Sequence, residues 1–190
     1  MRSLQNFNDQ PAGVAILADD VLEFHAARLL LLFKVCGAVK RVDKLPRIEG
    51  LTKMAKLDFF VRYPEFFDEI CQHLGAKSVV PSSLRPIESS MVRFHYGPWD
   101  KRYYHVLSYL EAKGLISVEQ DGAMYVLKLT GSGNALAGSA ETNPAFADLI
   151  QHMGRVKKVL GMKSGSALKD LVYKVFGEEV ADRPLGEVIE

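Results

Sequence analysis

The side chains best suited to chemistry are scattered along this chain, without the spacing that catalysis or metal binding requires. The histidines are His25, His73, His95, His105 and His152. They form no His-Glu-x-x-His motif and no Cys/His pair with the spacing of a zinc site. The two cysteines, Cys36 and Cys71, lie within apolar helical patterns, where free cysteine behaves as a small buried hydrophobe. We therefore predict no metal site and no cofactor.

Motifs for nucleotide hydrolysis and acyl transfer are also missing from the sequence. There is no GxxxxGK[ST] loop to cradle phosphates. The stretch from Gly161 to Gly165 reads GMKSG, which places its serine one position too late for a nucleophile elbow. Neighbouring carboxylates such as Asp68 and Glu69 would diverge on a helix rather than share a substrate. The sequence predicts a binding protein rather than an enzyme.

The composition of the chain bears on its cellular location and on its affinity for nucleic acid. A chain of 190 residues with 48% hydrophobic content can bury a substantial core. Its net charge of +1 gives no overall attraction to nucleic acid, so any such affinity must come from local clustering. The start, Met1 to Gln10, lacks an apolar signal core, and Lys34 interrupts the apolar run from Ala26 to Val39. We expect a cytoplasmic protein with no membrane segment.

A basic segment is the first candidate binding region. From Lys34 to Arg62 the chain carries eight basic and three acidic residues, a local charge of +5. Four of these basic residues are candidate DNA or partner contacts: Arg47, Lys53, Lys56 and Arg62. The stretch from Ile48 to Val61 has apolar residues near helical spacing, which predicts an amphipathic helix with a basic side. Such a side could contact phosphates, or it could be only a solvated face.

A mixture of cations and aromatic residues is the second candidate region. Its members are Arg93, His95, Tyr96, Trp99, Lys101, Arg102, Tyr103 and Tyr104. Of these, we select Arg93, Tyr96, Trp99 and Arg102 as candidate contacts. Such residues suit either a DNA groove or a protein hot spot. Plain core packing is an equal alternative for Trp99 and Tyr103.

The first half of the chain reads as three helices followed by an irregular connection. Apolar residues lie almost all round Val21 to Cys36, which predicts a central helix capped by Asp19 or Asp20 and stopped at Gly37. After the helix from Ile48 to Val61, Pro64 starts a shorter helix that runs to Leu74. The connection from Ala76 to Pro98 is a candidate functional loop, with one short strand expected at Met91 to Tyr96.

The second half carries the pattern most typical of a known architecture. Asp100 is expected to cap a helix from Lys101 to Lys113. Two apolar-rich strands, Leu115 to Glu119 and Met124 to Leu129, follow around an Asp-Gly turn, which is a strong hairpin signal. A further helix opens at Thr130. This order of helix, hairpin and helix indicates a winged helix-turn-helix, with the hairpin as its wing.

The predicted fold is therefore mainly α with a small β-hairpin, built as a winged helix-turn-helix core with additional C-terminal helices. Those helices are expected at Ala145 to Leu160 and Ser166 to Phe176. The predicted organisation is an N-terminal arm (1–18), a winged-helix domain (19–140), C-terminal helices (141–176) and an acidic tail (177–190).

Two segments of the sequence resemble a known family. They are RIEGLTKMAKLDFFVRYP, from Arg47 to Pro64, and ESSMVRFHYGPWDKRYY, from Glu88 to Tyr104. In these segments the chain is similar to the middle components of bacterial ABC three-component systems, and most similar to the small accessory subunit of Lamassu anti-phage and anti-plasmid defence complexes. The resemblance covers roughly Val21 to Ala137.

The resemblance implies a non-catalytic adaptor. Members of this family bind an SMC-like ABC ATPase near its head region and couple it to an effector, often a nuclease. ATP hydrolysis and DNA cleavage would then belong to the other subunits, and direct contact with double-stranded DNA stays open. The alternative function is a winged-helix transcription regulator, which the basic helix and the wing favour.

Overall fold

The computed structural model describes residues 21–77, 92–94 and 97–177. Within them the chain is mainly helical, with one antiparallel four-stranded sheet and a separate two-stranded hairpin. The predicted N-terminal arm, the caps Asp19 and Asp20, Tyr96 and the acidic tail beyond Gly177 lie outside the described residues.

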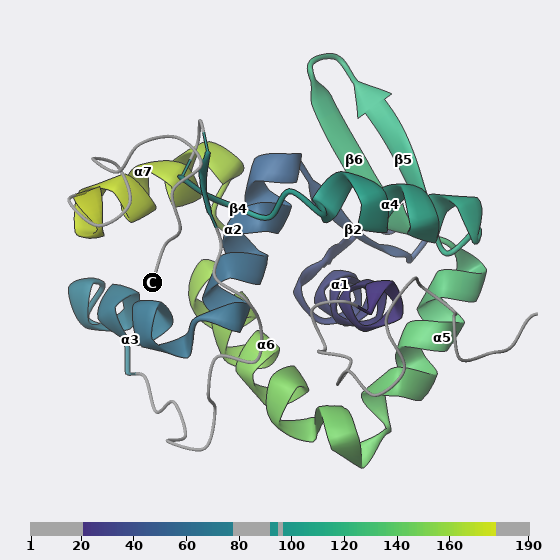
Figure 1. Ribbon diagram of the computed structural model, residues 1–190, viewed down its shortest axis with the longest axis horizontal. Coiled ribbons are helices and arrows are strands. Elements are labelled where there is room, and N and C mark those ends of the chain that lie inside the picture. Colours follow the sequence, from purple (N-terminus) through teal and green to yellow (C-terminus); the bar gives the residue numbers. More distant parts are fainter. Residues whose placement is uncertain (1–20, 78–91, 95–96, 178–190) are drawn as a thin grey trace, which may run out of the picture.

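Helix α1 (Leu22–Cys36) runs through the middle of the molecule, as the all-round apolar pattern predicts. Leu29, Leu31, Leu32 and Phe33 are fully buried. Figure 1 looks nearly down its axis and shows α4, α5, α6 and the sheet arranged around it. A helix that is apolar on every side is stable only when it is covered on every side.

The four-stranded sheet is larger than the predicted hairpin. Its strands are β1 (Ala38–Val39), β2 (Pro46–Glu49), β5 (Ile116–Asp121) and β6 (Met124–Leu129), in the order β1-β2-β6-β5. The prediction of a helix starting at Ile48 is wrong at its first residues, because Ile48 lies in β2 and pairs with Leu127 of β6. Burial alternates along β2, which is the period of a half-buried strand. Helix α2 (Leu51–Arg62) begins only after Gly50.

The predicted hairpin and the helix predicted to open at Thr130 are confirmed. Asp121 pairs with Met124, so Gly122 and Ala123 make a tight turn, and Gly122 supplies a φ of 61°. Helix α5 (Gly131–Glu141) starts at Thr130, whose hydroxyl accepts from the Gly133 N–H at 3.0 Å. The same hydroxyl donates to the Gly114 carbonyl at 2.7 Å. One side chain thus fixes both ends of the hairpin.

The segment before the hairpin differs in detail from the prediction. Strands β3 (Val92–Phe94) and β4 (Gly97–Trp99) form the two-stranded hairpin, and β3 falls within the predicted strand. Helix α4 (Tyr103–Ala112) begins two residues later than predicted. Asp100 does not cap it directly, because its Oδ1 accepts from the Arg102 N–H in the turn before the helix.

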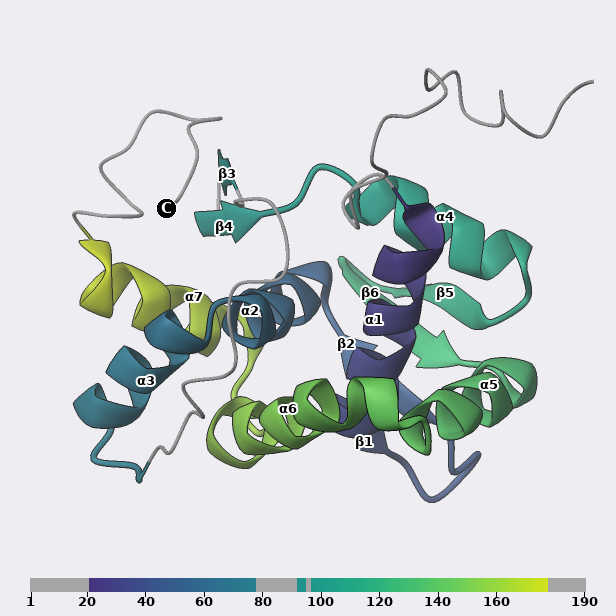
Figure 2. The ribbon, with the colours of Figure 1, turned by 60° about the horizontal axis from the view of Figure 1, so that its bottom comes forward.

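The C-terminal helices share the core of the preceding elements. Helix α3 (Pro64–His73) follows α2, and a short 3-10 turn (Pro144–Phe146) leads into α6 (Ala147–Leu160) and α7 (Gly165–Val175). Figure 2 shows α6 running beneath α1 and α2, with α7 beside α2. Buried residues from Ala26 to Phe176 form one continuous hydrophobic core.

No helix among the described residues has the length and apolarity needed to cross a membrane.

Two glycines of α5 give a direct test of this packing. A Cβ at Gly133 would lie 1.8 Å from the Leu115 carbonyl oxygen, whereas a Cβ at Gly138 would meet nothing within 4 Å. Gly133→Ala should therefore lower the free energy of unfolding by at least about 2 kcal/mol, because the backbone must shift to admit the methyl group. Gly138→Ala should raise it by about 1 kcal/mol, through helix propensity alone.

Urea unfolding followed by circular dichroism measures both changes. Equal effects of the two substitutions would show that α5 does not approach Leu115 in this way.

Candidate interaction surface

A buried carboxylate, Asp58 of α2, joins three helices. Its Oδ1 accepts from Arg28 Nε of α1 at 2.9 Å and its Oδ2 accepts from Arg28 Nη2 at 3.2 Å. The Tyr103 hydroxyl at the start of α4 donates to the same Oδ2 at 2.7 Å. All three side chains are buried. Burial and the Asp58 charge raise the pKa of Tyr103 well above its ordinary value, so the hydroxyl keeps its proton and donates.

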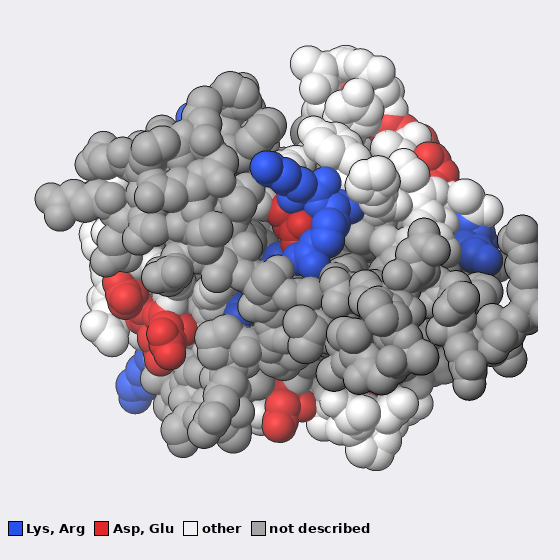
Figure 3. Space-filling view, in the orientation of Figure 1, with Lys and Arg blue, Asp and Glu red and all other residues white. Residues whose placement is uncertain are grey.

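A second ion pair extends this network toward the surface. Arg62 Nη1 donates to Asp100 Oδ2 at 2.7 Å, and Arg102 grips both oxygens of Asp100 with bonds of 2.9 and 2.7 Å. The His25 ring lies between Arg28 Nη1, 3.1 Å from its Nδ1, and Arg102 Nη1, 2.9 Å from its Nε2. In Figure 3, blue Lys and Arg atoms surround red acidic atoms over the segment between β4 and α4.

The two arginines also control the ionisation of Asp100. Burial alone would raise the pKa of Asp100, but hydrogen bonds from Arg102 and the charges of Arg62 and Arg102 outweigh burial. The pKa therefore lies well below its ordinary value, and Asp100 is ionised at neutral pH. The start of α4 is thus tied to α1 and α2 by charge-assisted hydrogen bonds.

Three of the predicted contact residues are used inside the molecule. Arg62 is 5% exposed and holds Asp100. Trp99 is 7% exposed and packs edge-on against Tyr103, with ring centroids 5.3 Å apart, so core packing is the correct alternative for both. Arg102 keeps about a third of its side chain exposed while it grips Asp100. The aromatic and basic cluster is therefore largely an internal network.

The predicted basic side of α2 is wrong. Lys56 is fully buried, and burial lowers its pKa to about 7. Lys53 is half-buried and donates from Nζ to the Gly161 carbonyl at 2.8 Å. Arg47 lies in β2 and pairs with Asp43. The net charge of +5 in this segment of the sequence therefore does not form a basic surface, because several of its basic side chains are buried or paired with other residues of the chain.

The remaining two predicted contacts are only partly placed. The backbone of Arg93 lies in β3, opposite Pro98 of β4. Its side chain, like the whole of Tyr96, lies outside the described part of the structure. Their assignment as contacts stays a prediction.

Exposed apolar and aromatic side chains lie on α4 and on both sides of the β5–β6 hairpin. Tyr104 is 56% exposed, Tyr125 42% and Met124 38%, although all three are large hydrophobic side chains. Residues 100–130, which contain these elements, carry four basic and four acidic residues. The sequence analysis missed Met124 and Tyr125. Their position directly after the Asp-Gly turn, at the exposed tip of the hairpin, was the available signal.

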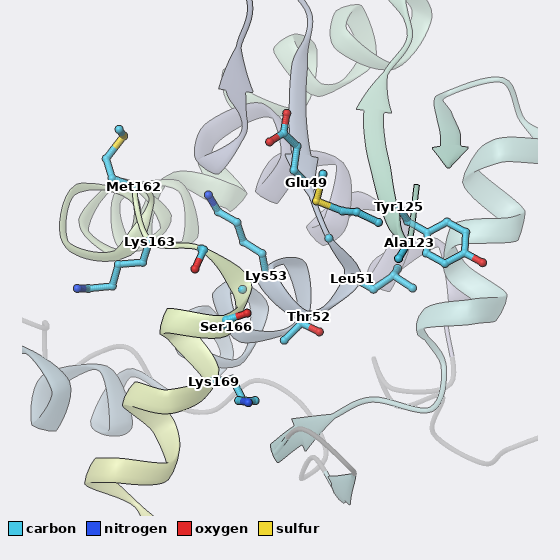
Figure 4. A pocket seen from close by; sticks show the side chains of 14 residues that line it. Glu49, Leu51, Thr52, Lys53, Ala123, Tyr125, Met162, Lys163, Ser166 and Lys169 are labelled. Carbon is cyan, nitrogen blue, oxygen red and sulfur yellow. The ribbon is translucent and has the colours of Figure 1, made fainter. Parts of the chain in front are cut away.

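A cavity of about 720 Å³ adjoins this hairpin tip. It lies between the start of α2, the start of β6 and the turn that joins α6 to α7. Figure 4 shows the Lys53 side chain reaching toward the turn that carries Met162, whereas Lys163 and Lys169 point away. The three amines diverge, so the cavity does not gather them around one anion.

The described residues contain no group of three or more His, Cys, Asp or Glu side chains placed to hold a metal ion. Comparison with protein-family models, with curated protein sequences and with solved structures finds no significant match for this chain.

Removal of the Asp58 charge tests the network. Asp58→Asn should lower the free energy of unfolding by about 3–5 kcal/mol, because the buried Arg28 guanidinium loses its counter-ion. Asp170→Asn is the control, because Asp170 is 70% exposed and, within the described ranges, forms an ion pair only with the neighbouring Lys169, so its loss should cost less than about 0.5 kcal/mol. Urea unfolding measures both. Similar small losses would show that Asp58 does not hold the helices together.

The low pKa of Lys56 predicts a specific pH dependence. Between a pKa of about 7 in the folded state and the ordinary 10.5, the unfolded chain binds more protons at this group. The contribution of Lys56 to stability therefore rises with pH through this window, and its cost is complete below it. Lys56→Met should stabilise the protein most at about pH 6 and progressively less toward about pH 10.

The exposed Lys157→Met is the matched control for Lys56→Met. The stabilisation by Lys56→Met relative to Lys157→Met should shrink as the pH rises from about 6 to about 10. A difference between the two variants that stays constant over this range would refute the lowered pKa of Lys56.

Proposed function

We propose that this chain is a non-catalytic adaptor that docks on a partner protein through the exposed face of α4 and the β5–β6 hairpin. The observation that carries the proposal is the exposure of Tyr104 on α4 and of Tyr125 on β6, in elements without excess positive charge. Aromatic side chains are enriched in protein interfaces, because they bury a large apolar area with few rotatable bonds. Methionine is also enriched, because its flexible side chain adapts to the shape of a partner.

The arrangement of the elements supports a winged helix as the scaffold. The chain runs from α1 through β2 and α2 to α4, and then through the hairpin β5–β6. In the sheet β6 lies between β2 and β5, so the hairpin is anchored to the body along one strand. In this proposal α4 is the helix that a winged-helix protein presents to its ligand, and β5–β6 is the wing. Helix α3 and the β3–β4 hairpin are then an insertion between the two helices of the motif.

The charge balance favours protein over DNA as the ligand of this face. Of the basic residues on α4 and the hairpin, Arg102 is engaged by Asp100 and Lys128 lies 3.0 Å from Glu119. Lys101 and Lys113 are exposed, but so are Glu111 and Asp121. A surface that binds phosphates needs a clear excess of cations, because counter-ion release supplies most of that affinity.

The partner in this proposal follows from the resemblance in Arg47–Pro64 and Glu88–Tyr104. We propose that the chain binds the head region of an SMC-like ABC ATPase in a Lamassu-type defence complex. The adaptor then couples this ATPase to an effector nuclease. The internal network gives the resembling segments a physical role, since Asp58 and Arg62 from the first bind Tyr103 and Asp100 from the second.

Co-expression with the coiled-coil ATPase encoded by the neighbouring gene tests the proposal. The two proteins should co-purify, and the double variant Tyr104→Ala/Tyr125→Ala should bind about tenfold more weakly or worse, because it removes two central aromatic anchors. Leu136→Ala is the control, since Leu136 is equally exposed on α5, away from this face. A chain that stays monomeric beside the ATPase would refute the adaptor function.

The second candidate function is a winged-helix DNA-binding regulator, favoured by the same placement of α4 before a hairpin. It requires that the isolated protein bind one duplex sequence well above bulk DNA, with an affinity that falls steeply with salt. Lys101→Glu, in the turn before α4, should then weaken DNA binding. Under the adaptor proposal this variant leaves assembly with the ATPase largely intact, because rim charges contribute little to affinity.

A further inference from the structure

A second cavity lies between the end of α3 and α6, on the side of the molecule away from the β5–β6 hairpin (Figures 1 and 2). Its volume is about 630 Å³. Half of its lining is apolar and comes from Phe67, Leu74, Ala76 and Val159. Leu74 is 39% exposed, whereas Phe67 is buried beneath it in the core. The cavity therefore has an apolar floor that is open to solvent.

The other half of the lining consists of cations. Lys77, Arg155, Lys158 and Lys163 surround the apolar floor, and no carboxylate is among the described residues that line the cavity. None of these four side chains forms a hydrogen bond or ion pair with another described residue. Elsewhere on the described surface, Lys40 and Lys128 lie beside carboxylates. The cavity is thus a concentration of uncompensated positive charge.

One of these cations has a buried donor without an acceptor. Arg155 Nη1 is shielded from solvent and has no hydrogen-bond partner among the described residues. A buried donor left unpaired costs about 1–3 kcal/mol, so native structures rarely leave such a group without a partner. A carboxylate accepts well from a guanidinium, often through two parallel bonds.

We propose that this cavity binds an acidic, amphipathic segment of a partner protein. An apolar side chain of the segment rests on Leu74, Phe67 and Val159, and a neighbouring carboxylate accepts from Arg155. Lys77, Lys158 and Lys163 attract the remaining negative charges of the segment.

A protein segment fits this lining better than nucleic acid does, because phosphate groups would leave the apolar half of the floor uncovered. The proposal is independent of the proposed adaptor function. It gives the chain a second docking surface, on α3 and α6.

Selection from a library tests the proposal without knowledge of the partner. The full chain is used to select from displayed random peptides of about 12 residues, a length sufficient for a helix or strand in a groove. The selected peptides should combine Asp or Glu with Leu, Ile or Phe. Fluorescence anisotropy then measures the binding of the synthetic peptides to the wild type and to variants.

Charge reversal decides whether binding occurs in this cavity. Arg155→Glu/Lys158→Glu should weaken peptide binding by about tenfold or more, because it replaces attraction by repulsion at two positions. Lys157→Glu/Lys113→Glu makes the same change in charge at exposed positions outside the cavity and should change binding by less than about threefold. Circular dichroism confirms that both variants are folded.

Apolar recognition is tested separately. Leu74→Ser should also weaken binding, whereas Leu136→Ser, which removes an equally exposed leucine on α5, should not. The proposal is overturned if the selection enriches no acidic amphipathic peptide, or if the two reversal variants behave alike. It is also overturned if acidic peptides without apolar residues bind equally well, or if duplex DNA or anionic vesicles compete for the cavity more strongly than the peptides do.

Discussion

The arrangement of this molecule depends on Asp58, a carboxylate with no exposed surface that binds Arg28 of α1 and Tyr103 of α4. A buried carboxylate is costly unless every oxygen finds a donor, and here both oxygens do. The three helices consequently have one favourable relative position, because sliding any of them would leave a charge unpaired. Buried polar groups of this kind define a structure more than they stabilise it.

The same network determines what α4 can present to a partner. Tyr103 and Trp99 face inward, so the neighbouring Tyr104 is directed outward on a helix that cannot rotate. Arg62, Asp100 and Arg102 secure the turn just before it. An aromatic side chain held on a rigid element loses little conformational entropy when it binds, which is the property of an effective anchor.

Much of the helical arrangement could be predicted from sequence, because local periodicity and caps determine it. Gly37 ends α1, Pro64 opens α3, and the Thr130 side chain caps α5. The surface could not be predicted in the same way. Lys56 and Arg62 look like an exposed basic side in any short window, and only partners distant in sequence show that they are interior. Ile48 was assigned to a helix because four residues of strand are too few to establish their own period.

The candidate surfaces were likewise predictable only where neighbouring residues in the sequence determine them. The cluster of cations and aromatic residues in the sequence does mark the segment that positions α4. Arg62 and Trp99, however, contact Asp100 and Tyr103 of the same chain, whereas the sequence predicts that they contact DNA or a partner protein. Hydrophobic residues in a strand normally indicate core, so the pattern of β6 hides the exposure of Met124 and Tyr125, and their place next to the Asp-Gly turn is the one local sign of it. The cavity beside Leu74 joins α3 to α6 across some eighty residues, so no local pattern could reveal it.

The single core that runs from Ala26 to Phe176 also governs how the chain can be made. Helix α1 leaves the ribosome with apolar side chains on all sides, yet α5 and α6, which cover it, are synthesised about one hundred residues later. Folding must therefore wait for the C-terminal helices, and during that interval the nascent chain exposes its most hydrophobic segment. For this protein, protection by chaperones matters most during translation, before α6 and α7 are available.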